Sequence, residues 1–226
     1  MEGGNYPTGC GATAVAQIMA YHSWPEKYTR SDLETLKSKW SLASSWDGKY
    51  DWEAMTEKPA ANDLSVLGKI CVGALMYDVS KGIDSTYEYD GTESFSNKIS
   101  KYLREINYVC NNFQLYSFDA IKTSLSKDCP ILTLGQNTND NSGHYWVIDG
   151  SLELKRTRNY YVCWIPFKST EYQKYVHCNY GWSGDCGDGS AYTYKGEGYY
   201  KSGVFETSKG NYSRDLLICT NIKPKK

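Results

Sequence analysis

The segment that most constrains this chain is residues 8–22, with the sequence TGCGATAVAQIMAYH. Thr8 is placed to cap a helix, so Cys10 is expected within the first helical turn. The helix dipole favours negative charge there, and therefore favours thiolate. Trp24-Pro25 ends the helix, because the residue before a proline avoids helical geometry. The cysteine is either a nucleophile or a small buried packing residue, and its own segment leaves both interpretations open.

Composition indicates one large domain, which we place at residues 1–226, because no Pro/Ser-rich linker divides the chain. The net charge is −1, with 25 basic and 26 acidic residues and no basic stripe or acidic block. Neither a nucleic-acid partner nor an anionic membrane is therefore indicated. The longest apolar run, near residues 70–76, is far shorter than the ~20 residues of a membrane span. No signal peptide opens the chain, which reads as a mature or trimmed sequence.

Eight cysteines are present, and none of them forms a CxxC pair. This spacing disfavours a structural zinc site or a thioredoxin-type motif, so we expect no metal and no cofactor. Cys178 and Cys186 flank a glycine-rich loop, and this spacing makes them the favoured local disulfide.

The hydrophobic pattern places helices first and strands second. Apolar spacing of three to four residues predicts helices over residues 31–39, 62–80, 95–106 and 118–127. The longest of these is expected to be capped by Asn62-Asp63. Strands are expected at residues 131–134, 144–148, 160–164, 175–178, 198–200 and 216–220. Segregated helices and antiparallel strands predict an α+β fold, in which the cysteine helix meets the strands at a seam.

Three histidines are candidates for a partner of Cys10. His22 ends the same helix, about 18 Å along its axis from the cysteine, and is interpreted as a packing or capping residue. His177 lies within a strand and remains undecided. His144 opens a strand directly after Gly143, at the rim of the expected sheet, where a group is rigid yet reachable. His144 is therefore the predicted functional histidine.

Three segments together resemble the streptopain family of papain-like cysteine proteases. Residues 8–25 resemble that family's nucleophile motif, and residues 143–150, GHYWVIDG, resemble its histidine motif. Residues 179–184, NYGWSG, resemble its Asn-Trp-Gly-Trp-Gly-Gly loop. The three occur in the family's order. The resemblance implies a two-lobed papain-like fold, with a helical N-terminal half packed on a barrel-like antiparallel C-terminal half and an active site at the seam.

Carried over to matching positions, the resemblance makes Cys10 the nucleophile and first oxyanion donor, and His144 the general base that becomes the acid. The His144 imidazolium is expected to lower the thiol pKa. Asn179 would accept from the His144 ring and Trp182 would shield that contact. The competing interpretation of Asn179 is that it only forms a turn before the glycine loop.

Several positions depart from the family pattern. Tyr180 stands where the family has tryptophan, within the support of the site. Tyr145 follows the histidine where relatives can carry a small residue, so with Gly143 it is predicted to contact substrate and to narrow a side-chain pocket. No glutamine precedes Cys10 to complete an oxyanion hole, and Gln17 lies on the wrong side of it. Residues 155–174 resemble an insertion. Because few residues precede Cys10, the resemblance leads us to expect that a pro-domain and part of the N-terminal arm are missing from this chain.

The resemblance implies a secreted or cell-surface bacterial cysteine endopeptidase, derived from a zymogen and acting as a virulence factor. Its implied partners are protein or peptide substrates and its own pro-domain or a dedicated inhibitor, with no nucleic acid and no membrane span. Two alternatives remain open. One is a catalytically weakened papain-like binding module, which the departures motivate. The other is a Cys-His acyl hydrolase acting on cell-wall peptides.

Overall fold

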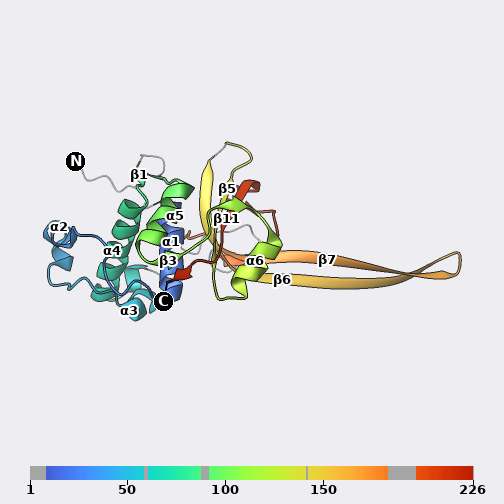
Figure 1. The fold of residues 1–226 in the computed structure, drawn as a ribbon, viewed down its shortest axis with the longest axis horizontal. Coiled ribbons are helices and arrows are strands. Elements are labelled where there is room, and N and C mark those ends of the chain that lie inside the picture. The colour runs from blue at the N-terminus through green and yellow to red at the C-terminus, as the bar shows by residue number, and fades with distance from the viewer. Residues whose placement is uncertain (1–8, 59–60, 88–91, 141, 183–196, 226) are drawn as a thin grey trace.

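The computed structural model describes residues 9–58, 61–87, 92–140, 142–182 and 197–225. Most helices cluster on one side of a sheet, α6 lies on the other, and a long two-stranded ribbon projects from the sheet (Figure 1). The helical elements are α1 (Cys10–His22), α2 (Leu33–Lys39), η1 (Ser41–Ala43), α3 (Trp52–Thr56), η2 (Ala61–Asp63), α4 (Val66–Gly82), α5 (Ser96–Glu105) and α6 (Phe118–Leu125). The expected helices are confirmed to within a few residues, apart from the start of α4.

Helix α1 is buried along most of its length. Its small residues Ala12, Ala14 and Ala16 and its larger apolar residues Val15, Ile18 and Met19 are all at most 8% exposed. A helix that is apolar all round belongs inside a domain. It begins at Cys10, as expected, and Gly9 precedes it with φ 88°, a conformation that suits glycine. The predicted cap, Thr8, lies outside the described residues.

Helix α4 begins at Val66, later than the sequence suggested. Ser65 is its N-cap, and the Ser65 hydroxyl accepts from the Gly68 amide at 3.1 Å. The prediction that Asn62-Asp63 forms this cap is wrong, because residues 61–63 form the separate turn η2.

The strands are β1 (Thr86–Tyr87), β2 (Thr92–Glu93), β3 (Tyr108–Val109), β4 (Gln114–Leu115), β5 (Ile131–Gln136), β6 (Gly143–Val162), β7 (Ile165–Asn179), β8 (Glu197–Lys201), β9 (Glu206–Thr207), β10 (Gly210–Asn211), β11 (Arg214–Cys219) and β12 (Lys223–Pro224). Six of them form an antiparallel sheet in the order β4-β11-β5-β6-β7-β8. The expected barrel does not close within the described residues. Strand β4, which pairs at only two positions, and strand β8 are the two opposite edges of an open sheet.

Side chains alternate across the sheet and so divide the core in two. On β6, Tyr145 and Val147 join the core around α1, α4 and α5. Their neighbours Trp146 and Ile148 join a second core, which includes Phe118 and Ile121 of α6. His144 has the parity of the second core, and this decides which side chains surround it.

Strands β6 and β7 continue past the sheet as a hairpin, paired without interruption from Ser151↔Val176 to Val162↔Ile165. The predicted strand at residues 160–164 is therefore the end of β6 and its turn rather than a separate strand. Residues 155–174, which resembled an insertion, form most of this ribbon (Figure 1).

In the described segments, no helix combines the length and the apolar character needed to cross a bilayer.

Gly135 pairs with His144 across β5 and β6, and a Cβ there would clash with the Tyr212 carbonyl oxygen and press on Trp146. We therefore expect Gly135→Ala to lower the free energy of unfolding by about 1–3 kcal/mol. Gly143→Ala is the matched control, because its added Cβ meets only Leu134, at an ordinary 3.6 Å. Urea denaturation of both variants checks this, and equal stability of the two would contradict it.

Candidate active site

Cys10 is the first residue of α1, and its partly buried thiol lies against strand β6. The backbone amides of Tyr145, Gly11 and Cys10 itself lie near the sulfur and favour its thiolate form. Burial raises the pKa of the Cys10 thiol, and these amide contacts only partly oppose that rise. The expected lowering of the thiol pKa is therefore not seen in this conformation, because removal from water outweighs the helix N-terminus.

His144 is 7% exposed, near the beginning of β6. Its Nε2 lies 3.1 Å from the carbonyl oxygen of Tyr180. A carbonyl can only accept, so Nε2–H is the donor, and Nδ1 of the neutral ring remains as a proton acceptor. Burial lowers the pKa of His144 to about 4, opposed by the Tyr180 carbonyl and reinforced slightly by Lys209.

Four aromatic rings surround the His144 imidazole and separate it from water. Their centroids lie at 4.7 Å for Trp182, 5.3 Å for Tyr212, 5.9 Å for Tyr180 and 6.3 Å for Trp146. Trp182 and Tyr180 thus pack against the predicted histidine. Tyr212 was not found from the sequence, because an isolated tyrosine far along the chain has no motif around it. The pKa of Tyr212 is raised by burial and, to smaller extents, by Asp140 and Cys10.

Asn179 ends β7, and its role differs in detail from the expected one. Its Oδ1 accepts from Gln17 Nε2 at 2.8 Å and from the Gly181 amide at 3.0 Å. The His144 ring donates instead to the main-chain carbonyl of the next residue, Tyr180. The Gly181 contact is an Asx-turn, the simpler of the two interpretations considered for this asparagine. By shaping that turn, Asn179 orients the peptide that holds the histidine.

Gln17 holds Asn179 from the central helix, so it faces the histidine side of the site rather than an oxyanion hole before Cys10. Its Oε1 is buried and has no hydrogen-bond partner among the residues that the structure describes. Sequence reasoning missed this contact, although a signal existed. Positions 10 and 17 are seven apart and therefore share one face of a helix.

The ring of Tyr145 lies elsewhere than predicted. It points to the α1 side of the sheet and is only 5% exposed, and its hydroxyl donates to the Ser94 carbonyl at 3.1 Å. Alternation along β6 puts it opposite to His144, so its ring packs in the core instead of narrowing a substrate pocket. Gly143 is exposed at the start of β6, beside the histidine.

The structure brings Cys10 next to the backbone of residue 145, with His144 one position before it. The His144 side chain turns to the other face of β6, where Trp146 also lies. A thiol, an imidazole acceptor and backbone amides at a helix start are the groups that acyl transfer requires.

The other two histidines have structural partners. His22 Nε2 is 2.9 Å from the Ile222 carbonyl oxygen, and burial lowers its pKa. His177 Nδ1 is 2.6 Å from Asp149 Oδ1 at the base of the hairpin. The predicted Cys178–Cys186 disulfide falls on residue 186, outside the described residues. No cluster of metal-ligating side chains occurs where the structure describes the chain.

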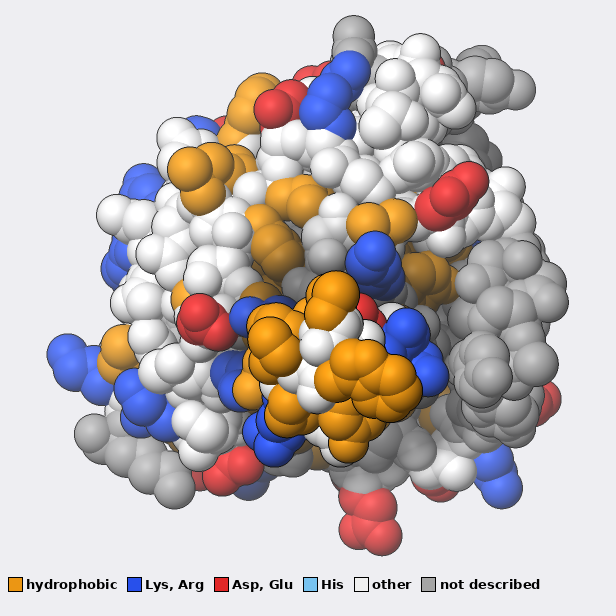
Figure 2. Space-filling model, turned by 90° about the vertical axis from the view of Figure 1, so that its right-hand side faces the viewer, with side chains coloured by type: hydrophobic (Ala, Val, Ile, Leu, Met, Phe, Trp, Pro, Cys, Tyr) orange, Lys and Arg blue, Asp and Glu red, His pale blue; other side chains and the backbone are white. Residues whose placement is uncertain are grey.

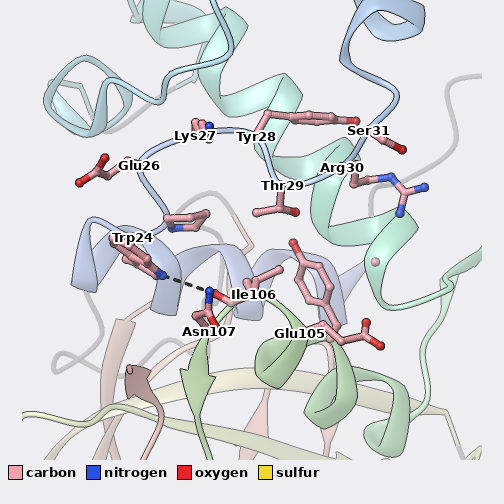
Figure 3. A pocket seen from close by; sticks show the side chains of 13 residues that line it. Trp24, Glu26, Lys27, Tyr28, Thr29, Arg30, Ser31, Glu105, Ile106 and Asn107 are labelled. Atoms are coloured by element: carbon pink, nitrogen blue, oxygen red, sulfur yellow. Dashed lines mark hydrogen bonds between the residues drawn. The ribbon is translucent and has the colours of Figure 1, made fainter. Parts of the chain in front are cut away.

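A cavity of about 560 Å³ lies away from these residues, between the loop at residues 24–31 and the end of α5 (Figure 3). None of the predicted site residues lines it. A smaller cavity of about 310 Å³ is lined by Gln17, Val147 and Asn179, behind the site. We assign the site by its chemistry rather than by cavity size.

Comparison with known proteins agrees with the motifs. The Peptidase C10 family matches residues 1–189. The chain belongs to this family. Streptopain of Streptococcus pyogenes is 28% identical over 195 residues, which cover 78% of this chain and 43% of streptopain. The thiol protease/hemagglutinin PrtT of Porphyromonas gingivalis is 23% identical over 231 residues, which cover 96% of this chain and 24% of PrtT. The chain thus spans less than half the length of these family relatives.

The fold is also similar to solved structures. Active wild-type interpain A cysteine protease of Prevotella intermedia matches with a TM-score of 0.63 at 17% identity, covering 99% of this chain and 86% of that one. A prointerpain A fragment matches with a TM-score of 0.61 at 18% identity, covering 100% and 66%. This likeness concerns the fold, and it agrees with a mixed α/β architecture built on an antiparallel sheet.

The low His144 pKa makes stability depend on pH. The unfolded state takes up a proton near the ordinary histidine pKa of ~6.5, whereas the folded ring does so only near 4. The contribution of neutral His144 to the free energy of unfolding is therefore fully present above pH ~6.5. It falls by about 2–3 kcal/mol on acidification to pH ~4.5. In His144→Gln this pH-dependent loss should disappear. Urea unfolding of the parent and the variant at pH ~6.5 and pH ~4.5 measures the difference.

Proton NMR titration of the three histidines gives an independent check, since His144→Gln identifies the signal. A His144 pKa above the ordinary value would instead show that an imidazolium–thiolate pair already exists in the free protein.

Proposed function

We propose that this chain is a cysteine endopeptidase in which Cys10 is the nucleophile and His144 the general base and acid. The observation that carries the proposal is the position of the Cys10 thiol, at the start of α1 and beside the backbone amide of the residue after His144. His144 is held by the Tyr180 carbonyl so that Nδ1 is the acceptor. Family membership and the fold support the same chemistry.

In the proposed reaction, His144 Nδ1 takes the thiol proton as the sulfur attacks a peptide carbonyl. The backbone amide of Cys10 donates to the developing oxyanion at the helix start. The imidazolium then protonates the leaving amine, which leaves a thioester. Water, activated by the neutral imidazole, hydrolyses the thioester and releases Cys10.

Asn179 and Trp182 support this reaction without touching the reacting atoms. Asn179 fixes the turn whose Tyr180 carbonyl binds Nε2, and Trp182 and Tyr180 cover the ring. Approach of the thiol to Nδ1 would raise the His144 pKa from its buried value, because a thiolate stabilises the imidazolium. Gly143, exposed beside the histidine, is the proposed substrate contact.

Proteins or peptides are the proposed substrates, and export to the cell surface or medium is the proposed location. The named relatives are proteases, and one matched structure is of a pro-form, which supports a pro-domain as partner. One observation favours a second function, a weakened papain-like binding module. The neutral imidazole and the raised thiol pKa are poor for catalysis unless substrate changes them.

Cys10→Ala is expected to abolish hydrolysis of casein, by at least about a thousandfold, because covalent catalysis is lost. Cys163→Ala is the matched control, since this cysteine is exposed on the hairpin, far from the site in the sheet. An epoxide inhibitor followed by mass spectrometry should label Cys10 ahead of the other cysteines. A folded parent protein with no activity and no preferential labelling would favour the binding module.

Gln17→Met is expected to lower kcat about tenfold with KM nearly unchanged, because Asn179 and the Tyr180 carbonyl lose their support. The His144 NMR pKa should shift with it, which loss of packing alone would not cause. Gln114→Met on the exposed edge strand β4 serves as the control. A change in KM alone would contradict a positioning role.

A further inference from the structure

The outer end of the β6–β7 hairpin, residues 160–167, carries an exposed apolar cluster that we call the hairpin tip. Trp164 is 96% exposed, Tyr161 73% and Ile165 58%. Tyr160 and Phe167 stack at 5.8 Å beneath them. Figure 2 looks onto this end of the molecule and shows apolar side chains gathered there with Lys and Arg side chains around them. Such an apolar patch on a projecting element marks a binding surface.

The turn of the hairpin is built against local preference. Cys163 and Trp164 connect the Val162↔Ile165 pair, with φ of 48° and 66°. Two successive positive φ values define the tight turn that usually takes Asn-Gly, because larger residues are strained there. A bulky indole at this position does not help the hairpin to form. Its presence therefore points to a function outside folding.

Four cations lie just behind the tip: Lys155, Arg156, Arg158 and Lys168. Residues 154–170 contain no acidic side chain. The register places Arg156 and Arg158 on one face of the ribbon and Lys155 and Lys168 on the other, so the charges surround it. Arg158 has one partner, Glu171, at 4.0 Å. The sequence alone shows no basic stripe, because Lys168 lies on the second strand. Pairing of the two strands brings it near Lys155, Arg156 and Arg158.

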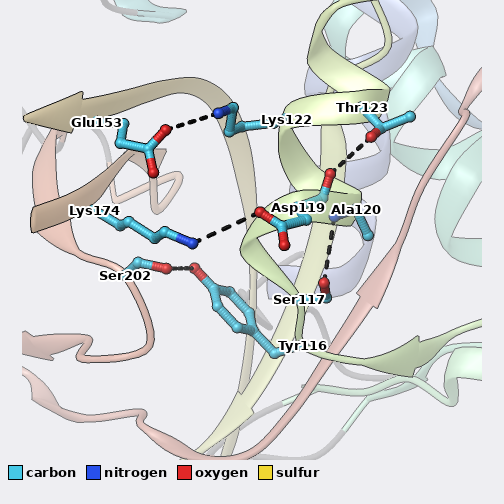
Figure 4. Close-up of polar contacts among 9 residues, drawn as sticks. All are labelled: Tyr116, Ser117, Asp119, Ala120, Lys122, Thr123, Glu153, Lys174 and Ser202. Carbon is cyan, nitrogen blue, oxygen red and sulfur yellow. Dashed lines mark hydrogen bonds and ion pairs between the residues drawn. The ribbon is translucent and has the colours of Figure 1, made fainter. Parts of the chain in front are cut away.

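The hairpin leaves the domain in a fixed direction. At its base, Lys122 of α6 pairs with Glu153 at 2.9 Å, and Asp119 pairs with Lys174 at 3.6 Å (Figure 4). The Lys174 ammonium also lies 4.9 Å from the centre of the Phe118 ring. From Ser151 to Val162 the ribbon reaches about 40 Å beyond this base. The tip is thus held away from both cores.

We propose that the hairpin tip inserts into the interface of an anionic phospholipid bilayer. Trp and Tyr favour the boundary between headgroups and acyl chains, and cations behind them attract anionic headgroups. The tip spans three residues of each strand, about 10 Å, which matches the depth of interfacial insertion. The ribbon's outer edges carry unpaired backbone groups, so insertion stops at the interface.

A protein partner fits the tip less well. A stable protein interface needs about 800 Å² on each side, and the end of a two-stranded ribbon is narrow. The absence of acidic residues from this segment also favours a uniformly anionic surface over the mixed surface of a typical protein. The proposal does not depend on peptidase activity.

Co-sedimentation of the full chain with vesicles tests the proposal. We expect binding to phosphatidylcholine vesicles that contain phosphatidylglycerol, weakened by salt, and much weaker binding to phosphatidylcholine alone. Trp164→Ser with Ile165→Ser should weaken binding about tenfold or more. Arg156→Glu with Lys168→Glu should weaken it about fivefold or more for each charge changed. Leu115→Ser, at a 79% exposed leucine on β4, should bind as the parent does.

Three results would overturn the proposal. The first is no sedimentation with anionic vesicles. The second is equal vesicle binding by the parent and by the Trp164→Ser/Ile165→Ser variant, which we call the tip variant. The third is a loss of vesicle binding in the Leu115→Ser control as large as that in the tip variant. Self-association without lipid binding, abolished by the tip variant in analytical ultracentrifugation, would assign the tip to a second copy of the chain instead. Hydrolysis of a short peptide should be the same in the parent and the tip variant, which separates failure here from failure of the proposed function.

Discussion

The contact between helix α1 and strand β6 is the constraint on which the rest of the structure depends. The small residues of α1 allow it to lie buried between the helical core and the sheet, with its first residue beside the start of β6. The amide of Tyr145 then meets the Cys10 sulfur, and the alternation of the strand turns His144 to the opposite face. Every other part of the site is attached to one of these two elements: Gln17 to the helix, and Tyr180 and Trp182 to the histidine.

Burial gives the site its order and also its electrostatic character. The rings around His144 exclude water and fix the imidazole, and the same exclusion lowers its pKa to about 4 and raises the pKa of Cys10. The two groups are therefore uncharged in this conformation, and a charged pair would require them to stabilise one another. A site with neutral groups is compatible with a peptidase whose reacting pair forms only when substrate binds. If the Cys10 thiolate then approaches the His144 ring, it raises the pKa of the ring.

The sheet serves two purposes through the same strands. One end of β6 and β7 carries His144 and Asn179, and the other end forms the projecting hairpin. The ion pairs with α6 at the base separate the two regions. Only a ribbon of paired strands, without packed core, connects the hairpin tip to the site. The loss of an aromatic side chain at the tip should therefore leave the site unchanged.

The sequence by itself determined the family and most of the helices, and it singled out Cys10 and His144 as the predicted reacting pair. These depend on local patterns: helical spacing, a strand boundary and short motifs. It did not determine that Tyr145 would pack in the core, that Tyr180 would hold the histidine through its carbonyl, or that Tyr212 would lie on the ring. Nor did it predict the open sheet or the ring of cations on the hairpin. Those features depend on which strands pair, in which register and against which core, and such contacts between distant residues are decided only when the whole chain has folded.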